Sequence, residues 1–119
     1  MRVITGAARG TRLSAPEGMQ TRPTADRVKE ALFSIIQFEI EGRRVLDLFA
    51  GTGQLGIEAL SRGARSAVFV DNRAEAARLV QENLKKTRLE AHARVLTCDY
   101  AAFLGTVREQ FDIIFLDPP

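Results

Sequence analysis

Cysteine and histidine are scarce in this chain of 119 residues, which contains one of each, Cys98 and His92. A single cysteine cannot form a disulfide within the chain. One cysteine and one histidine are also too few for a structural zinc site. We therefore expect both residues to be structural and no metal to be bound.

Long apolar runs are also missing. No stretch approaches the roughly 18 apolar residues of a membrane span, and the N-terminus, MRVITGAARG, lacks the apolar core of a secretory signal. A composition of 45% hydrophobic and 27% charged residues is ordinary for one globular domain. We expect a cytoplasmic monomer without membrane attachment.

Acidic side chains are absent from residues 1–16, which carry Arg2, Arg9 and Arg12, although the net charge of the chain is only +2. A basic arm on a near-neutral body suits contact with nucleic-acid phosphates, while an ordinary surface segment remains the alternative. The arm itself is predicted to be a short hairpin, in which Val3 and Ile4 form one side and residues 11–13 form the other.

Strands and helices are predicted to alternate after this arm. The first helix is expected to have Thr24 as its N-cap after Pro23, and its apolar stripe comprises Val28, Ala31, Leu32, Ile35 and Ile36. Strands are predicted at residues 44–49, 67–70, 94–97 and 111–116. Further helices are predicted near residues 54–61, 76–84 and 101–107. This alternation predicts an α/β fold with a Rossmann-like parallel sheet covered by helices on both faces.

Each predicted strand leads to an aspartate, and the four are Asp47, Asp71, Asp99 and Asp117. Ligands of such sheets bind outside the carboxyl ends of the strands. The four carboxylates are therefore predicted to surround one site.

A glycine-rich turn follows the first of these aspartates. Its G-x-G-x-x-G pattern, Gly51, Gly53 and Gly56, with Asp71 lying 20 residues after Gly51, fits a dinucleotide site. Asp47 argues against that ligand, because a carboxylate would repel the pyrophosphate. S-adenosylmethionine instead carries a cationic sulfonium and an ammonium group. We therefore assign it to Asp47 and to the turn residues Phe49, Ala50, Gly51, Thr52, Gly53 and Gly56.

The next two aspartates are predicted to bind the nucleoside part of the cofactor. Asp71 can accept hydrogen bonds from both ribose hydroxyls, and Asp99 can accept from the adenine amine. Asp99 can equally be the N-cap of the following helix, and both roles are compatible. Asn72 and Tyr100 are assigned to the same site, and Asn72 with Glu75 also resembles a capping box.

Asp117-Pro118-Pro119 is the predicted catalytic segment. Two prolines lock the backbone and end the ladder of strand hydrogen bonds, which holds one carboxylate and one carbonyl in place. An aromatic amine is a weak nucleophile because its lone pair is delocalised into the ring. Two acceptors that hold its hydrogens favour a pyramidal nitrogen, so positioning and electrostatics would supply most of the rate. A simple strand-ending turn is the alternative.

These motifs resemble a known family. DLFAGTG from Asp47 with a later Asp-Pro-Pro is similar to methyltransferases that modify exocyclic amines of nucleobases. RVITG from Arg2, RPTADRVKEALF from Arg22 to Phe33, and LSRGA from Leu60 resemble the RsmD family, bacterial 16S ribosomal RNA guanine-N2 methyltransferases.

The resemblance implies a seven-stranded methyltransferase fold with an N-terminal RNA-recognition hairpin, assigned to residues 1–21, and a methyltransferase domain from residue 22 to 119. It implies S-adenosylmethionine as methyl donor and a flipped guanine of the small subunit, or of its assembly intermediate, at Asp117. Arg22 and Thr24 would lie near the mouth of the site. The residues assigned to RNA contact are Arg2, Arg9, Arg12, Arg22, Thr24 and Arg27.

The chain departs from the family pattern where it stops. The family has an aromatic residue after the second proline and three more strands, so we expect a shortened chain with an exposed apolar edge at the fourth strand and doubtful activity. Three other functions stay open: an adenine or glutamine amino-methyltransferase, a nicotinamide oxidoreductase, and a noncatalytic cofactor- or RNA-binding module.

Overall fold

The computed structural model describes residues 1–16 and 23–118, with only the backbone described for residues 23–25. One sheet has four parallel strands in the order β3-β2-β1-β4. The strands are β1 (Arg44–Asp47), β2 (Ser66–Asp71), β3 (Ala93–Thr97) and β4 (Ile113–Phe115). The helices are α1 (Pro23–Ile36), α2 (Gln54–Ser61), α3 (Ala74–Thr87), the 3-10 turn Glu90–His92, and α4 (Tyr100–Thr106). The predicted alternation and the parallel sheet are confirmed.

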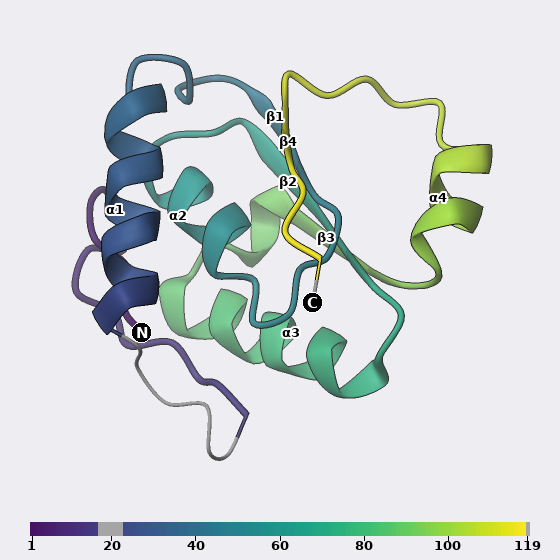
Figure 1. Cartoon of the computed structure of the whole chain (residues 1–119), viewed down its shortest axis with the longest axis horizontal. Coiled ribbons are helices and arrows are strands. Elements are labelled where there is room, and N and C mark those ends of the chain that lie inside the picture. Colours follow the sequence, from purple (N-terminus) through teal and green to yellow (C-terminus); the bar gives the residue numbers. More distant parts are fainter. Residues whose placement is uncertain (17–22, 119) are drawn as a thin grey trace.

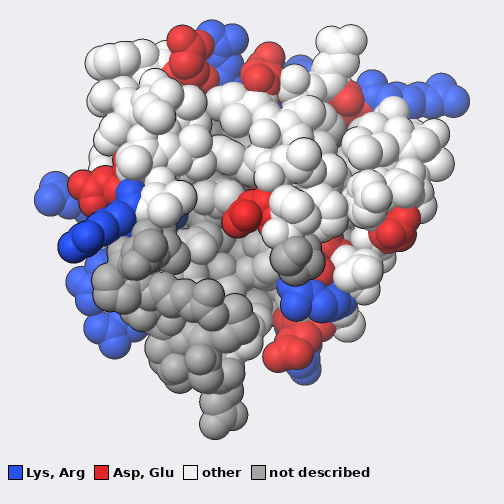
Figure 2. All heavy atoms as spheres, viewed as in Figure 1, with Lys and Arg blue, Asp and Glu red and all other residues white. Residues whose placement is uncertain are grey.

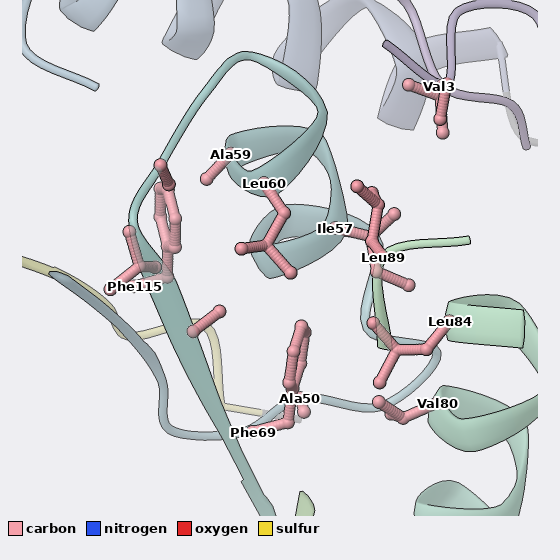
Figure 3. Close-up of a cluster of buried hydrophobic side chains, with 14 of the residues drawn as sticks. Val3, Ala50, Ile57, Ala59, Leu60, Phe69, Val80, Leu84, Leu89 and Phe115 are labelled. Atoms are coloured by element: carbon pink, nitrogen blue, oxygen red, sulfur yellow. The ribbon is translucent and has the colours of Figure 1, made fainter. Parts of the chain in front are cut away.

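Helices cover the sheet on both faces. Neighbouring residues of each strand point to opposite faces, so they enter two different cores. Val45 and Phe69 belong to a core shared with α1, α2 and α3, whereas Leu46 and Val68 belong to the core beneath α4. Figure 3 shows Phe69 in the first of these cores, with Ile57 of α2 and Val80 of α3. Figure 1 shows α4 on the opposite side of the sheet from the other three helices. None of the helices described is long and apolar enough to cross a membrane.

The strand order creates a switch point at β1. From β1 the chain steps outward through β2 to β3, and α4 then returns it to β4, on the other side of β1. The helices that follow β1 and β3 consequently lie on opposite faces, and in sheets of this kind ligands bind at the carboxyl ends of the strands beside such a switch point. Asp47 pairs in register with Phe115 there, two residues before Asp117.

The expected cap of α1 is wrong, and the expected apolar stripe is confirmed only at Leu32 and Ile36, which pack against the core. The helix begins at Pro23, so Thr24 lies inside its first turn; proline is favoured at this first position because its missing N–H has no partner to lose. On the expected stripe, Val28 and Ile35 are 64% and 81% exposed, whereas Lys29 and Phe33 are buried.

Tertiary contacts determine which face of α1 is buried. Lys29 Nζ lies 3.4 Å from the buried carboxylate of Glu58 and donates a hydrogen bond to the Arg2 carbonyl. The ring of Phe33 packs against Phe115, with 5.6 Å between ring centroids. A buried cation with a partner rotates the helix away from the orientation that the apolar pattern predicts.

The N-terminal hairpin is confirmed and docks on α2. Its two sides are joined by backbone bonds from Val3 to Thr11 and from Leu13 to Met1. Glu58 accepts from the amides of Ile4 and Thr5, at 2.9 and 3.1 Å. Ser61 Oγ accepts from Ala8 and donates to the Thr5 carbonyl. A Cβ on Gly6, whose φ is +97°, would lie 1.9 Å from the backbone carbonyl oxygen of Ser61, so this docking requires glycine.

The ends of β1, β4 and α3 differ from prediction. β1 stops at Asp47, and β4 spans only the residues that pair with Val45–Asp47. The capping box of Asn72 and Glu75 is wrong: α3 begins at Ala74, and its cap position, Arg73, makes no side-chain cap bond. Asp71 accepts the Arg73 amide instead, which moves the helix start by one residue.

Candidate functional site

The glycine-rich turn lies between the ends of three strands. The Leu48 amide donates to the Phe115 carbonyl at 3.1 Å, and the Ala50 amide donates to the Val70 carbonyl at 3.0 Å. Gly51 and Gly53 then adopt φ values of +58° and +82°. These left-handed conformations favour glycine and turn the chain into α2.

Asp47 lies beneath this turn and is 1% exposed. Its Oδ2 accepts a hydrogen bond from the Gly56 amide at 3.0 Å, so the carboxyl points at the first turn of α2. Burial raises the pKa of Asp47 to about 7, and the nearby charges of Asp117 and Asp71 add to the shift against the Gly56 hydrogen bond. Asp47 therefore stabilises the junction between the glycine turn and α2.

Gly56 allows α2 to approach β2. A Cβ at this position would lie 2.4 Å from the ring of Phe69. The third glycine of the motif therefore serves helix-to-strand packing, one of the roles that its pattern predicts.

Asp71 holds the other side of the turn. Its Oδ2 accepts from the Gly51 amide and its Oδ1 from the Arg73 amide, both at 3.0 Å. The Arg73 guanidinium adds an ion pair at 3.1 Å. Burial alone would raise the pKa of Asp71, but the hydrogen bonds from Arg73 and Gly51 outweigh it and lower the pKa below its ordinary value. Arg73 was not anticipated, although its position two residues after a strand-end carboxylate is a usable signal.

The amides of the three motif glycines all have acceptors within the protein. Gly51 donates to Asp71, Gly56 to Asp47, and Gly53 to the Ala50 carbonyl at 2.7 Å. A pyrophosphate bound at such a turn needs amides of this kind as donors. The site therefore suits a cationic ligand better than a dinucleotide.

Gln54, the first residue of α2, also favours a cationic ligand. Its Oε1 is buried and has no hydrogen-bond partner within the part of the chain that the structure describes. A buried oxygen of this kind is an acceptor available to a ligand ammonium group. Sequence reasoning missed it, because a glutamine after a glycine turn carries no distinctive pattern.

Asp99 and Tyr100 lie at the end of β3. Asp99 is the N-cap of α4 and accepts from the amides of Ala101 and Ala102 at 3.0 and 3.3 Å, so the capping alternative is confirmed. The ring of Tyr100 packs against Phe49, with 5.2 Å between centroids. The fold thus brings two predicted cofactor residues together from the ends of β1 and β3, while Asn72 is exposed at the end of β2.

The Asp-Pro-Pro segment follows β4 at the same edge. Asp117 and Pro118 are exposed, and Pro119 lies outside the described residues. Asp117 follows Phe115, the register partner of Asp47, by two residues, and its charge adds to the raised pKa of Asp47.

Four of the residues assigned to RNA are exposed arginines of the N-terminal arm and of α1. Arg2 and Arg12 are exposed and form an antiparallel bridge, which places like charges on one face. Arg9 and Arg27 are also exposed, whereas Arg22 lies outside the described residues. Figure 2 shows basic side chains along the left margin of the view, where Figure 1 places α1 and the N-terminal arm.

The side chains of His92 and Cys98 make no hydrogen bond within the part of the chain that the structure describes, although the Cys98 amide donates to the Asp71 carbonyl at 3.0 Å. His92 is exposed at the end of a 3-10 turn, and Cys98 is half-buried against the core beneath α4. Within residues 1–16 and 23–118, no three metal-ligating side chains come together.

The chain resembles known proteins along its whole length. The family model described as Conserved hypothetical protein 95 matches residues 1–119. YlbH of Bacillus subtilis (strain 168) is 48% identical over 122 residues, an alignment that covers 100% of this chain and 66% of YlbH. Ribosomal RNA small subunit methyltransferase D of Escherichia coli (strain K12) is 40% identical over 120 residues, with coverage of 100% and 60%. The chain thus spans less than two thirds of these relatives.

Solved structures agree. The Escherichia coli protein yhhF matches with a TM-score of 0.90 and 38% identity, over 100% of this chain and 64% of that one. The T. thermophilus 16S rRNA N2 methyltransferase RsmC, solved with AdoMet and guanosine, matches with a TM-score of 0.70 and 30% identity, over 87% of this chain and 27% of that one.

Proposed function

Because the chain belongs to the Conserved hypothetical protein 95 family, that of the RsmD methyltransferases, we propose that it forms the cofactor-binding part of a 16S ribosomal RNA guanine-N2 methyltransferase. Its fold is the Rossmann-like fold of S-adenosylmethionine-dependent methyltransferases. The observation that carries the proposal is that Asp71 and Asp47 accept from the amides of Gly51 and Gly56, which makes these two amides unavailable to a pyrophosphate and places acidic groups at the turn, where they favour a cation.

S-adenosylmethionine is the cofactor in this proposal and supplies an electrophilic methyl group. Asp71 would hold the ribose hydroxyls once its Arg73 partner moves aside, a change that the 63% exposure of the Arg73 side chain permits. Phe49, Tyr100 and Asp99 would border the adenine. Ala50, Thr52 and Asn72 would complete the wall of the site, and Gln54 Oε1 would accept from the ammonium group.

Methyl transfer would take place at Asp117. The carboxylate and a carbonyl of the Asp-Pro-Pro segment would accept the two amine hydrogens of the guanine. This grip would aim the nitrogen lone pair at the methyl group, so the rate would come from positioning and electrostatics. Guanine N2 is favoured as the acceptor because RsmC, solved with guanosine, shares this fold at 30% identity.

The RNA would be contacted by the N-terminal arm. We assign residues 1–21 to this role and residues 22–119 to the methyltransferase domain. Exposed Arg2, Arg9, Arg12 and Arg27 would bind phosphates, with Arg22 and Thr24 nearer the reacting base. Small-subunit RNA or its assembly intermediate is the proposed partner of a monomeric protein.

Calorimetry distinguishes this proposal from a nicotinamide enzyme. We expect S-adenosylhomocysteine, the product of the methyl donor, to bind the chain while NADH does not. Binding of NADH alone would overturn the proposal.

Two substitutions separate the cofactor and substrate roles, each measured in the complete gene product. Asp71→Ala should weaken S-adenosylhomocysteine binding. Asp117→Ala should leave that binding intact and abolish methyl transfer to small subunits. Equal loss of cofactor binding in both variants would contradict the assigned roles.

A third experiment tests the arm. Replacing Arg9 and Arg12 with alanine should flatten the dependence of RNA affinity on salt concentration, because fewer counterions are released. An unchanged slope would return these arginines to an ordinary surface role.

A further inference from the structure

Asn83 is a polar residue in the middle of α3 with no exposed surface. Its neighbours on the buried face of that helix, Val80 and Leu84, are apolar core residues. Burying an amide is costly unless all of its polar atoms find partners. Asn83 finds them in two segments that are far away in the sequence.

The first partner is Ser14 of the N-terminal arm, the residue after the last backbone bond of the hairpin. The Ser14 amide donates to Asn83 Oδ1 at 2.6 Å, and Asn83 Nδ2 donates back to the Ser14 carbonyl at 3.0 Å. The side chain thus pairs with the backbone as a neighbouring strand would. The second partner is the carbonyl of Thr52, which accepts from Asn83 Nδ2 at 2.9 Å.

Thr52 lies between the two left-handed glycines of the turn, so one amide group joins the cofactor turn to the arm. A further contact agrees with this link: Thr52 Oγ1 donates to the sulfur of Met1 at 3.6 Å. Asp71 and Asp47 hold the backbone amides of Gly51 and Gly56 in the turn. The side-chain amide of Asn83 holds the Thr52 carbonyl.

Asparagine suits this position better than aspartate, leucine or glutamine would. The site requires two donors, toward the carbonyls of Ser14 and Thr52, and one acceptor. Aspartate has no donor and would face both carbonyls with a negative charge, while leucine has a similar volume and no polar atom. Glutamine would add a methylene to a buried position.

We propose that Asn83 is a positioning residue that couples cofactor binding at the glycine turn to RNA binding by the N-terminal arm. This inference rests on the proposed function. Because coupling between two ligands is reciprocal, cofactor should strengthen RNA binding by the same factor as RNA strengthens cofactor binding.

The test measures the affinity of S-adenosylhomocysteine with and without saturating 16S ribosomal RNA. In the natural protein we expect RNA to tighten cofactor binding about fivefold or more. In Asn83→Asp and Asn83→Leu this factor should fall to about one, and cofactor affinity should drop about tenfold with the loss of a buried hydrogen bond. Gln81→Ala, an exposed position on the same helix, and Ser14→Ala, which keeps the backbone bonds, are matched controls that should retain the coupling.

A purely structural role for Asn83 would weaken each ligand separately and leave the coupling factor unchanged. That result, or a factor of one in the natural protein, would overturn the inference while leaving the proposed function in place. Failure of the natural protein to bind S-adenosylhomocysteine would instead overturn the proposed function, together with the inference that rests on it.

Hydrogen exchange in the natural protein gives a second test that does not depend on whether the variants fold. Saturating S-adenosylhomocysteine should slow exchange of the Ser14 amide at least about threefold, because a fixed Thr52 carbonyl fixes the Asn83 side chain. The Arg65 amide, which donates to the Arg43 carbonyl at the far end of the sheet, should not change. Equal exchange of Ser14 with and without the ligand would overturn the inference.

Discussion

Replacing Asp47 by asparagine should change how the stability of the protein depends on pH. The substitution removes an ionisable group that is 1% exposed while preserving its size and an oxygen that can accept from Gly56. Burial raises the pKa of Asp47 from 3.8 to about 7. The folded protein therefore keeps a proton at pH values where the unfolded chain has released it.

The sign follows from proton linkage. A carboxyl with a higher pKa in the folded state stabilises the fold most at low pH, and that stability is lost as the pH rises through the folded pKa. A shift from 3.8 to about 7 corresponds to about 4 kcal/mol over the whole range. From about pH 5 to about pH 8, roughly 2–3 kcal/mol of this should disappear. The asparagine variant lacks this loss because its side chain stays neutral.

Urea unfolding of both proteins measures the effect. The free energy of unfolding of the natural protein minus that of Asp47→Asn should fall by roughly 2–3 kcal/mol from about pH 5 to about pH 8. Asp112→Asn, at the opposite end of the sheet, shows what the loss of one exposed carboxylate does by itself. Parallel curves for the natural protein and Asp47→Asn would refute the assignment of a buried, protonated carboxyl.

Two further predictions concern the packing of α2 and a buried ion pair, and the free energy of unfolding in urea measures both. Gly56→Ala should destabilise the protein by about 1–3 kcal/mol, because its Cβ would lie 2.4 Å from the Phe69 ring, whereas Gly105→Ala, in an exposed helix with open space, should stabilise it by about 0.5–1 kcal/mol. The same sign for both would contradict the packing role. Glu58→Gln should cost about 3 kcal/mol or more by leaving the buried charge of Lys29 without the carboxylate that pairs with it, and adding Lys29→Met should recover part of that loss. Strict additivity of the two changes would argue against a coupled pair.

Much of the fold can be predicted because it depends on local patterns. The glycine turn and α2, predicted and found at Gln54–Ser61, follow from residues that are adjacent in the sequence. The parallel sheet follows from the alternation of strands and helices together with crossover handedness. These rules also place the four aspartates at one edge before any contact is known.

The orientation of α1 could not be predicted in the same way. Its apolar residues form a stripe, yet Ile35 is 81% exposed and Lys29 is 2% exposed. A hydrophobic pattern cannot reveal a buried lysine, because the partner that makes its burial tolerable, Glu58, stands on another helix.

The candidate site divides along the same line. The sequence alone determined the order of the elements, the glycine turn and the carboxylates at the strand ends, since backbone conformation and strand polarity depend on neighbouring residues. Only the tertiary structure decided that Asp47 points beneath the turn, that Arg73 pairs with Asp71, and that Asn83 joins Thr52 to Ser14. The physical reason is that a buried polar group is stable only with partners, and folding brings those partners from distant parts of the chain.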